Sequence, residues 1–467
     1  MRRLGLALLC LPLACQKKDS PRPKQPPLVR FFLDSIGLEG ESRLPSRFTL
    51  RWYGDDPDGY IVGYEVRLSP QDWRFTTQQE STFVVPFTAG EQYKDVVVEV
   101  RAVDNDGLRT TPPARLRVPL RNSPPLCKLQ PQLAPPDTTL PAITLSFTLE
   151  DPDGSETLDS LYLRIGNGPW FALSPRHRLL TLVPVDPTAP SPTYIFAGTS
   201  LTPIATLPTP LPLDDTVRIA LRVKDQGGLF SEIETTQPIY IRRKTADWLF
   251  LDSWNNDEAY TALEADLRSS WGAYDYWNLR LNTHRPPALI PTWLHIWRLY
   301  PRIFWIGSSI TIEDLEAAEV LIEKYLQQGG RLCVNFPLPA RLDTTSAIFR
   351  WSPMDSLSRQ EQDGLLPPNS PVQAQVSGFP NLTNGLPFFL SGINPPYPKG
   401  TAQVLYEMPG LIRGNGQPWP SGLPRTAAIG FPTASGKFLQ IYLILPLHQL
   451  GGPRTDFLTA LQNAFLP

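Results

Sequence analysis

Two similar stretches of sequence decide the fold of the first half of the chain: FTLRWYGDDPDG at residues 48–59 and ITLSFTLEDPDG at residues 143–154. Apolar and polar residues alternate at the start of each stretch, which predicts a strand with one buried face, and Phe48, Leu50 and Trp52 share that face. Both stretches end in Asp-Pro-Asp-Gly, which is typical of tight turns because aspartate hydrogen-bonds its own turn and glycine accepts positive φ. We therefore predict two strands that lead into the same acidic turn.

The similarity continues towards the end of each segment. VEVRAVDNDGLRTT at residues 98–111 corresponds to VRIALRVKDQGGLFSE at residues 217–232, so each copy carries a second turn, Asp-x-x-Gly, after a late strand. Turn signals recur through both segments, and Gly166-Asn167-Gly168 is a strong hairpin turn. The repeat predicts two related β-sandwich modules, at residues 28–122 and 123–243.

The first module resembles fibronectin type III and related immunoglobulin-like (Ig-like) modules. The resemblance rests on Trp52 in an early strand and on VRAVDNDGLRTTPPARLRV at residues 100–118. It implies a β-sandwich, and the internal repeat extends the same expectation to the second module.

The acidic turns also raise the question of a metal ion or a catalytic acid. Because Ca²⁺ takes about six to eight oxygen ligands, a calcium site is expected if the two turns of the first module meet. Its ligands would come from Asp55, Asp56, Asp58, Asp104 and Asp106. The second module offers fewer acids, namely Asp151, Asp153 and Asp225. Paired acids for glycoside hydrolysis are disfavoured, since loop acids on small sandwiches seldom line a cleft. The equivalent positions of the turns favour a structural role.

The first fifteen residues, MRRLGLALLCLPLAC, predict a signal peptide. Two arginines precede an apolar run at residues 4–14 that is too short to span a bilayer as a helix. The end, PLAC, resembles the lipobox of bacterial lipoproteins, which implies that Cys15 carries lipid and becomes the mature N-terminus. A simple cleaved signal is the alternative. Residues 16–27 are predicted to form a proline-rich tether.

The residues that follow Cys15 bear on localisation. No aspartate comes directly after it, which argues against retention in the inner membrane, and CQKKD resembles the surface-export signal of Bacteroidota lipoproteins. We expect a protein anchored to the outer membrane through its lipid, at the cell surface, with the periplasmic face as the alternative.

Composition excludes some classes of function. The chain has 43 basic and 45 acidic residues, so nothing suggests a nucleic-acid-binding protein, which would show a basic excess or stripe. The 53 prolines fit many loops and edge strands, because proline lacks the N–H that a central strand needs. Outside the signal peptide and Cys15, only Cys127 and Cys333 remain, so we expect no disulfide framework.

The pattern changes near residue 244. Short apolar runs at residues 247–252, 302–309 and 331–336 predict buried strands, and residues 256–271 and 311–330 have helical spacing. Strands that alternate with helices predict a parallel α/β sheet. We predict an α/β domain at residues 244–467, with a proline-rich insertion at about residues 337–400.

This domain resembles non-catalytic members of the glutamine amidotransferase-like superfamily. The resemblance rests on FWIGSS at residues 304–309, YLQQGGRLCVNF at 325–336, and the ending at 426–465. It implies a flavodoxin-like fold of three layers. Catalytic relatives carry Gly-x-Cys-x-Gly at a sharp elbow. Cys333 instead lies between Leu332 and Val334, so we expect packing rather than catalysis and no cofactor beyond Ca²⁺ at the acidic turns.

Two features of this domain are candidates for binding. WGAYDYWNLR at residues 271–280 supplies Trp271, Tyr274, Tyr276 and Trp277, which we expect to be partly exposed and able to contact a glycan or a partner protein, with a core role as the alternative. His448 follows an apolar strand-like run, and ligands bind beyond strand ends in open α/β sheets.

Together these patterns predict a lipid-anchored cell-envelope protein with a binding or structural role. Docking in an outer-membrane protein complex, adhesion and contact with a surface glycan all fit. The alternative is a surface hydrolase that acts on glycans or peptides through residues 244–467. The absence of an assembled nucleophile, base and elbow in that segment favours the non-catalytic interpretation.

Overall fold

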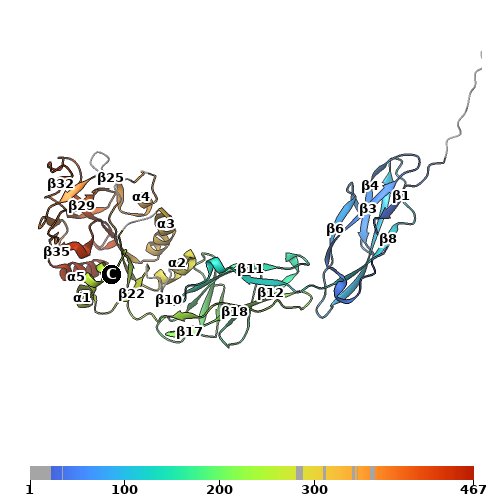
Figure 1. Ribbon diagram of the computed structural model, residues 1–467, viewed down its shortest axis with the longest axis horizontal. Coiled ribbons are helices and arrows are strands. Elements are labelled where there is room, and N and C mark those ends of the chain that lie inside the picture. The colour runs from blue at the N-terminus through green and yellow to red at the C-terminus, as the bar shows by residue number, and fades with distance from the viewer. Residues whose placement is uncertain are drawn as a thin grey trace, which may run out of the picture. The chain divides into compact units, whose positions relative to one another are not determined.

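The computed structural model describes residues 23–33, 35–279, 288–308, 312–338, 342–343, 345–357 and 363–466, without the side chains of 312–318. Cys15, the predicted signal peptide and residues 16–22 of the predicted tether lie outside this range. The chain forms two compact units (Figure 1). The first contains Met1–Pro125, Glu150–Leu158 and Asp225–Phe230, and the second contains the rest. The predicted division into two modules and an α/β domain is a different partition and stays a prediction.

The first unit holds a β-sandwich, as predicted. One sheet has the order β1-β3-β6, formed by Leu28–Phe31, Arg47–Asp55 and Glu80–Val84. The other has the order β2-β8-β7-β4-β5, formed by Leu44–Pro45, Ala114–Arg121, Tyr93–Asp104, Ile61–Leu68 and Arg74–Thr76. Phe48, Leu50 and Trp52 point into the core from β3, where Val98 of β7 also lies. The alternation in the sequence therefore marked the buried face correctly.

The second unit begins with another pair of sheets. The order of the larger sheet is β16-β15-β14-β11-β9, from Ala205–Leu207, Thr193–Ala197, Leu179–Pro184, Ile143–Glu150 and Leu126–Leu129. The order of the smaller sheet is β13-β12-β18-β19, from Phe171–Leu173, Leu158–Ile165, Ile219–Asp225 and Glu234–Thr235. A short third sheet, β10-β20-β17, uses Thr138–Thr139, Ile239–Ile241 and Asp215–Val217.

The remainder of the second unit is built around a ten-stranded sheet. Its order is β22-β21-β23-β24-β34-β33-β31-β27-β28-β35, and the first five strands are parallel. These five are Asp275–Asn278, Trp248–Ser253, Arg302–Gly307, Arg331–Asn335 and Phe438–Leu443. Numbered along the chain, they follow the order 2-1-3-4-5. The other five are antiparallel: Thr426–Pro432, Gln403–Glu407, Pro371–Ala374, Leu382–Asn384 and Leu450–Gly451.

Helices connect the parallel strands. α1 (Glu258–Trp271) packs against α5 (Arg454–Phe465), and α2 (Ile290–Arg298) packs against α3 (Ile312–Gln327). In Figure 1 the two pairs lie on opposite sides of the sheet. α1 and α3 coincide with the helices predicted at residues 256–271 and 311–330. The described residues contain no helix that is both long and apolar enough to cross a bilayer.

Residues 337–400, predicted as a proline-rich insertion, supply β27 and β28 of the main sheet and add further strands beside it. They contain α4 (Ile348–Trp351) and the paired strands β25 (Met354–Leu357) and β30 (Pro396–Pro398). A separate sheet has the order β29-β26-β32, from Leu390–Ile393, Gly364–Leu366 and Ile412–Arg413. Side chains from this region, among them Ile348 and Leu390, join the core of the second unit. The insertion is therefore part of the folded domain.

Candidate functional site

The acidic turns hold the chain where it enters a sandwich. In the first copy, the Asp58 carboxylate accepts a hydrogen bond from the backbone N–H of Gln25 (3.0 Å), three residues before β1. In the second copy, Asp153 accepts one from the backbone N–H of Ser123 (2.7 Å), three residues before β9. Asp153 also accepts a bond from the N–H of Ser46 (2.7 Å). The equivalent aspartates Asp58 and Asp153 therefore both bind the backbone just before a strand of their sandwich.

The second turn of each copy is also closed by its own aspartate. Oδ1 of Asp104 accepts the backbone N–H of Leu108 (2.8 Å), and Oδ1 of Asp225 accepts the N–H of Leu229 (2.7 Å). Asp225 is further held by the amide of Asn122 (2.9 Å). These contacts explain why the motif occurs twice, because a buried aspartate that caps its own turn is needed in both sandwiches.

Burial raises the pKa of two aspartates in the acidic turns of the second copy, Asp151 and Asp225. The pKa of Asp151 is raised to about 6, chiefly by removal from water and also by the neighbouring carboxylates of Asp153 and Asp225, while hydrogen bonds from Thr157 and the Asp153 amide limit the rise. Burial likewise raises the pKa of Asp225. The charged carboxylate is therefore less favoured at Asp151 and Asp225 than it would be in water.

The calcium prediction gains no support from the described residues. They contain no group of three or more His, Cys, Asp or Glu side chains placed to hold a metal ion. Oδ1 of Asp104 accepts backbone N–H groups, Asp106 pairs with Lys24, and Asp55 is exposed. Calcium binding at Asp55, Asp56, Asp58, Asp104 and Asp106 stays a prediction.

The aromatic stretch at residues 271–280 divides into core and partly exposed side chains. Trp271 stacks on Trp248 with ring centroids 4.0 Å apart, and its indole N–H donates to the carbonyl of Leu458 (3.1 Å). Trp277 is also buried, so the expectation of exposure is wrong for both tryptophans: the strand and helix that carry them face the core. Tyr274 and Tyr276 are half-buried, and their role in binding stays a prediction.

Polar groups gather at the carboxyl end of β21. Asp252 is fully buried, accepts the backbone N–H of Trp254 (2.8 Å) and accepts the phenol of Tyr276 (3.0 Å). The amide of Asn278 donates to the Tyr276 oxygen (3.1 Å) and to Asp257 (3.3 Å). Burial and the Asp252 carboxylate raise the pKa of the Tyr276 phenol, which keeps it protonated as a donor. The network stabilises the strand end, with Asp252 buried inside it and Asp257 exposed at its border.

His448 lies beside this network, at the edge where its position in the sequence placed it. Its ring meets Trp254 edge-on at 4.3 Å, and only 7% of the residue is exposed. Burial lowers the pKa of His448 to about 4, while Glu258 raises it and Arg454 lowers it, so the imidazole is neutral at pH 7. Neither ring nitrogen has a hydrogen-bond partner within the described ranges. A ligand role for His448 stays a prediction.

Cys333 cannot act as an exposed nucleophile. It lies in the middle of β24 with no exposed surface, and burial raises the pKa of its thiol. A thiolate is the nucleophilic form, so both access and ionisation disfavour reaction. This agrees with the packing role predicted from its apolar neighbours.

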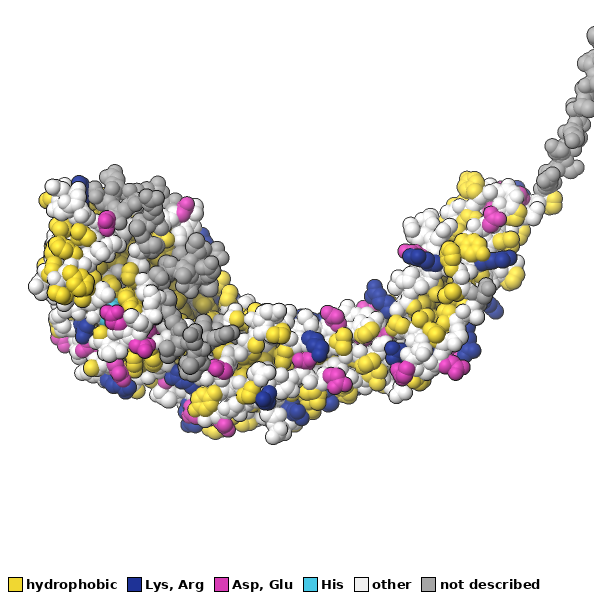
Figure 2. Space-filling model, in the orientation of Figure 1, with side chains coloured by type: hydrophobic (Ala, Val, Ile, Leu, Met, Phe, Trp, Pro, Cys, Tyr) yellow, Lys and Arg dark blue, Asp and Glu magenta, His cyan; other side chains and the backbone are white. Residues whose placement is uncertain are grey.

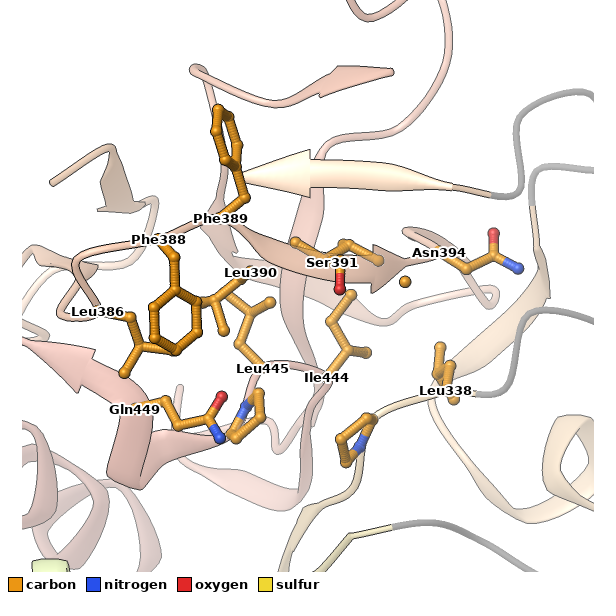
Figure 3. Close-up of a pocket in the computed structure, with 14 residues that line it drawn as sticks. Leu338, Leu386, Phe388, Phe389, Leu390, Ser391, Asn394, Ile444, Leu445 and Gln449 are labelled. Carbon is orange, nitrogen blue, oxygen red and sulfur yellow. The ribbon is translucent and has the colours of Figure 1, made fainter. Parts of the chain in front are cut away.

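A pocket that sequence reasoning missed opens at the same edge of the sheet (Figure 3). It has a volume of about 190 Å³ and lies beyond the ends of β24 and β34, beside β29. Figure 3 shows Phe388 and Leu386 on one side, Leu338 on the other, and Ile444 and Leu445 between them. The lining residues are Pro337, Leu338, Leu386, Phe388, Phe389, Leu390, Ser391, Gly392, Ile393, Asn394, Ile444, Leu445, Pro446 and Gln449.

The surroundings of this pocket are uncharged, with exposed aromatic side chains beside the polar residues Ser391, Asn394 and Gln449. Phe388 is 60% exposed and Phe389 is 47% exposed. Figure 2 shows hydrophobic side chains gathered over the part of the domain where Figure 1 labels β29, β32 and β35. None of the lining residues carries a charge. The run LPFFL at residues 386–390, inside a proline-rich segment, was the available signal in the sequence.

The comparisons with known proteins are sparse. No family model matches the chain, and no curated protein matches it. Among solved structures, fibronectin(III)-like modules of Clostridium thermocellum CbhA align with 12% identity over 46% of this chain and 94% of theirs, at a TM-score of 0.18. A two-domain fibronectin type III segment of chicken tenascin aligns with 13% identity over 43% of this chain and 96% of its own, at 0.20.

A third solved structure, dimeric latent PorU from Porphyromonas gingivalis, aligns with 12% identity over 49% of this chain and 21% of its own, at a TM-score of 0.17. The first two structures belong to the family that the β-sandwich sequence resembles. At such TM-scores the β-sandwich architecture rests on the strand pairing of this chain itself.

Proposed function

We propose that this protein is a lipid-anchored binding and structural protein of a bacterial cell envelope, in which β-sandwich modules carry an α/β domain that docks a partner protein. The β-sandwich modules suit a structural or binding role. The observation that carries the proposal is the open, uncharged pocket beside β29, with the exposed Phe388 and Phe389 at its border.

Exposed aromatic side chains next to a pocket favour binding. Apolar surface in contact with water is costly, and large apolar patches on soluble proteins usually mark interaction sites. Anchoring residues at protein interfaces are enriched in aromatic groups that fill pockets on the partner. Phe388 and Phe389 lie at such a place, while Trp271 and Trp277, two of the four aromatics that the sequence favoured, are buried in the core.

The α/β domain is proposed to be a non-catalytic, flavodoxin-like domain of the glutamine amidotransferase-like type. Support comes from the parallel strand order 2-1-3-4-5, which is the flavodoxin-like order, and from helices on both faces of the sheet. The burial of Cys333 supports a role in binding, because this cysteine offers no accessible thiolate.

The proposed location depends on Cys15. The charged start, the apolar run and PLAC support lipidation, and CQKKD supports export to the cell surface, where an outer-membrane protein complex is the proposed partner. We expect native protein in the membrane fraction and Cys15→Ala protein in the soluble or secreted fraction. Metabolic labelling with a radioactive fatty acid would mark only the native chain. Equal membrane retention and equal labelling of both proteins would refute the anchor.

Docking is tested by gentle-detergent isolation of the native lipoprotein from its own membranes, followed by mass spectrometry. We expect a stoichiometric partner that is lost in the Phe388→Ser/Phe389→Ser double variant. Phe75→Ser is the matched control, because Phe75 is 58% exposed but lies on the first β-sandwich. A partner-free native protein would refute the docking role.

A further inference from the structure

We propose that the pocket beside β29 receives a single uncharged apolar side chain, aromatic or branched aliphatic, presented by the partner protein. This inference rests on the proposed docking function and names the chemistry of the partner at that site. Three observations carry it: the size of the pocket, the nature of its lining and the exposure of Phe388.

Size limits the occupant to one side chain. The pocket volume is about 190 Å³, whereas pockets for drug-sized ligands usually measure about 300–1,000 Å³. An apolar cavity of about 150 Å³ is large enough to hold benzene. A phenylalanine ring or a leucine side chain therefore fits, and a complete cofactor or an oligosaccharide does not.

The lining selects against charge. Leu338, Leu386, Ile444 and Leu445 supply most of the wall seen in Figure 3, and no lining residue is ionisable. A buried ammonium or carboxylate would lose its hydration without an opposite charge. The polar side chains of the lining, Ser391, Asn394 and Gln449, carry no charge that could replace that hydration. An apolar side chain has no charge to desolvate, so the uncharged pocket complements an uncharged occupant.

The edge of β29 argues against addition of a partner strand. β29 is the terminal strand of its sheet, but its pairing with β26 is irregular and Gly392 has φ of +69°. Bulges and residues with positive φ interrupt the regular row of backbone N–H and C=O groups with which a new strand would pair. The site therefore binds through its pocket, and the exposed ring of Phe388 covers the occupant from one side.

The first test uses short neutral peptides on the full chain with labelled isoleucine methyl groups. Acetyl-Gly-Phe-Gly-amide and its leucine counterpart are expected to shift the NMR signals of Ile393 and Ile444. The lysine and glutamate counterparts are expected to bind at least about tenfold more weakly, because their charges lose hydration in the pocket. Equal or tighter binding of a charged peptide, or shifts caused by glucose instead, would overturn the inference.

The second test separates the pocket from the docking function as a whole. Ser391 is exposed and its side chain points into the pocket in Figure 3, so Ser391→Trp is expected to fill the pocket and abolish the peptide shifts. Ser391→Ala leaves the pocket open and is the matched control. If native protein isolates a partner and Ser391→Trp isolates it equally well, the pocket inference fails while the docking function stands. If native protein has no partner but binds the phenylalanine peptide, the docking function fails.

Discussion

Asp153 should be the most sensitive position in the acidic turns. Its carboxylate accepts two short hydrogen bonds, from the backbone N–H groups of Ser46 and Ser123, both at 2.7 Å. Only 1% of Asp153 is exposed, so water cannot replace these bonds when the side chain is removed. Asp153→Ala therefore leaves two buried donors without an acceptor.

The magnitude follows from the number and type of bonds. A hydrogen bond to a charged group contributes about 1.5–3 kcal/mol, so loss of both should cost the first unit roughly 3–6 kcal/mol. A typical domain has only about 5–15 kcal/mol of stability, and the loss is a large fraction of it. The equivalent Asp58 makes one bond of 3.0 Å in an exposed turn, so Asp58→Ala should cost about 1 kcal/mol or less.

Hydrogen exchange followed by mass spectrometry is the suitable assay, because twelve tryptophans make fluorescence hard to assign to one unit. In Asp153→Ala, peptides that cover Ser46 and Ser123 should exchange about 100-fold faster or more, since each 1.4 kcal/mol changes the opening constant tenfold. Peptides from β21 and β24, in the second unit, serve as internal controls. The reasoning is refuted if Asp153→Ala and Asp58→Ala accelerate exchange equally.

Three further predictions follow from burial. The pKa of Asp151 is raised to about 6 from 3.8, so its contribution to stability is present at low pH and is lost as the pH rises through 6. In urea unfolding, lowering the pH from 7.5 to 5 should stabilise the native first unit by about 1.4 kcal/mol relative to the Asp151→Asn variant. A stability difference that does not change with pH would contradict this prediction. Trp271→Ala removes the stack on Trp248 and should lower the free energy of unfolding of the second unit by about 3–5 kcal/mol. Peptide binding at the pocket should not change. Loss of binding in a folded variant would show that the Trp271 ring has a further role. Cys333 should resist iodoacetamide at pH 8 in the folded protein and react after denaturation, and rapid labelling of the folded chain would show that β24 opens.

Both sandwiches share a packing feature that the sequence comparison did not include. In each, a tryptophan side chain is flanked by two arginine guanidinium groups at 4.3–4.6 Å from the ring centroid, close enough for cation–π attraction. The residues are Trp73 with Arg67 and Arg101, and Trp170 with Arg164 and Arg222. The arginines come from strands at matching places in the two copies, so the internal repeat extends to the outer face of the sheet.

The sequence was sufficient wherever a local pattern determines the structure. The alternation at Phe48, Leu50 and Trp52 identified the buried face of β3, and glycines at the end of the helix near residue 330 marked its limit. The sequence also predicted the acidic turns, in which Asp104 and Asp225 accept backbone N–H groups of their own turns, because aspartate and glycine meet the needs of a tight turn by themselves. Periodicity and turn chemistry are properties of neighbouring residues, so they can be read along the chain.

Only the tertiary structure decided which side chains meet across long distances in the sequence. Asp153 reaches the amides of Ser46 and Ser123 because the turn at residues 150–158 folds into the first unit, and no local pattern states this. The exposure of an aromatic side chain depends on what covers it, so Trp271 lies in the core while Phe388 lies at the surface. The pocket, likewise, is formed where the ends of two parallel strands meet an insertion that the sequence showed only as proline-rich.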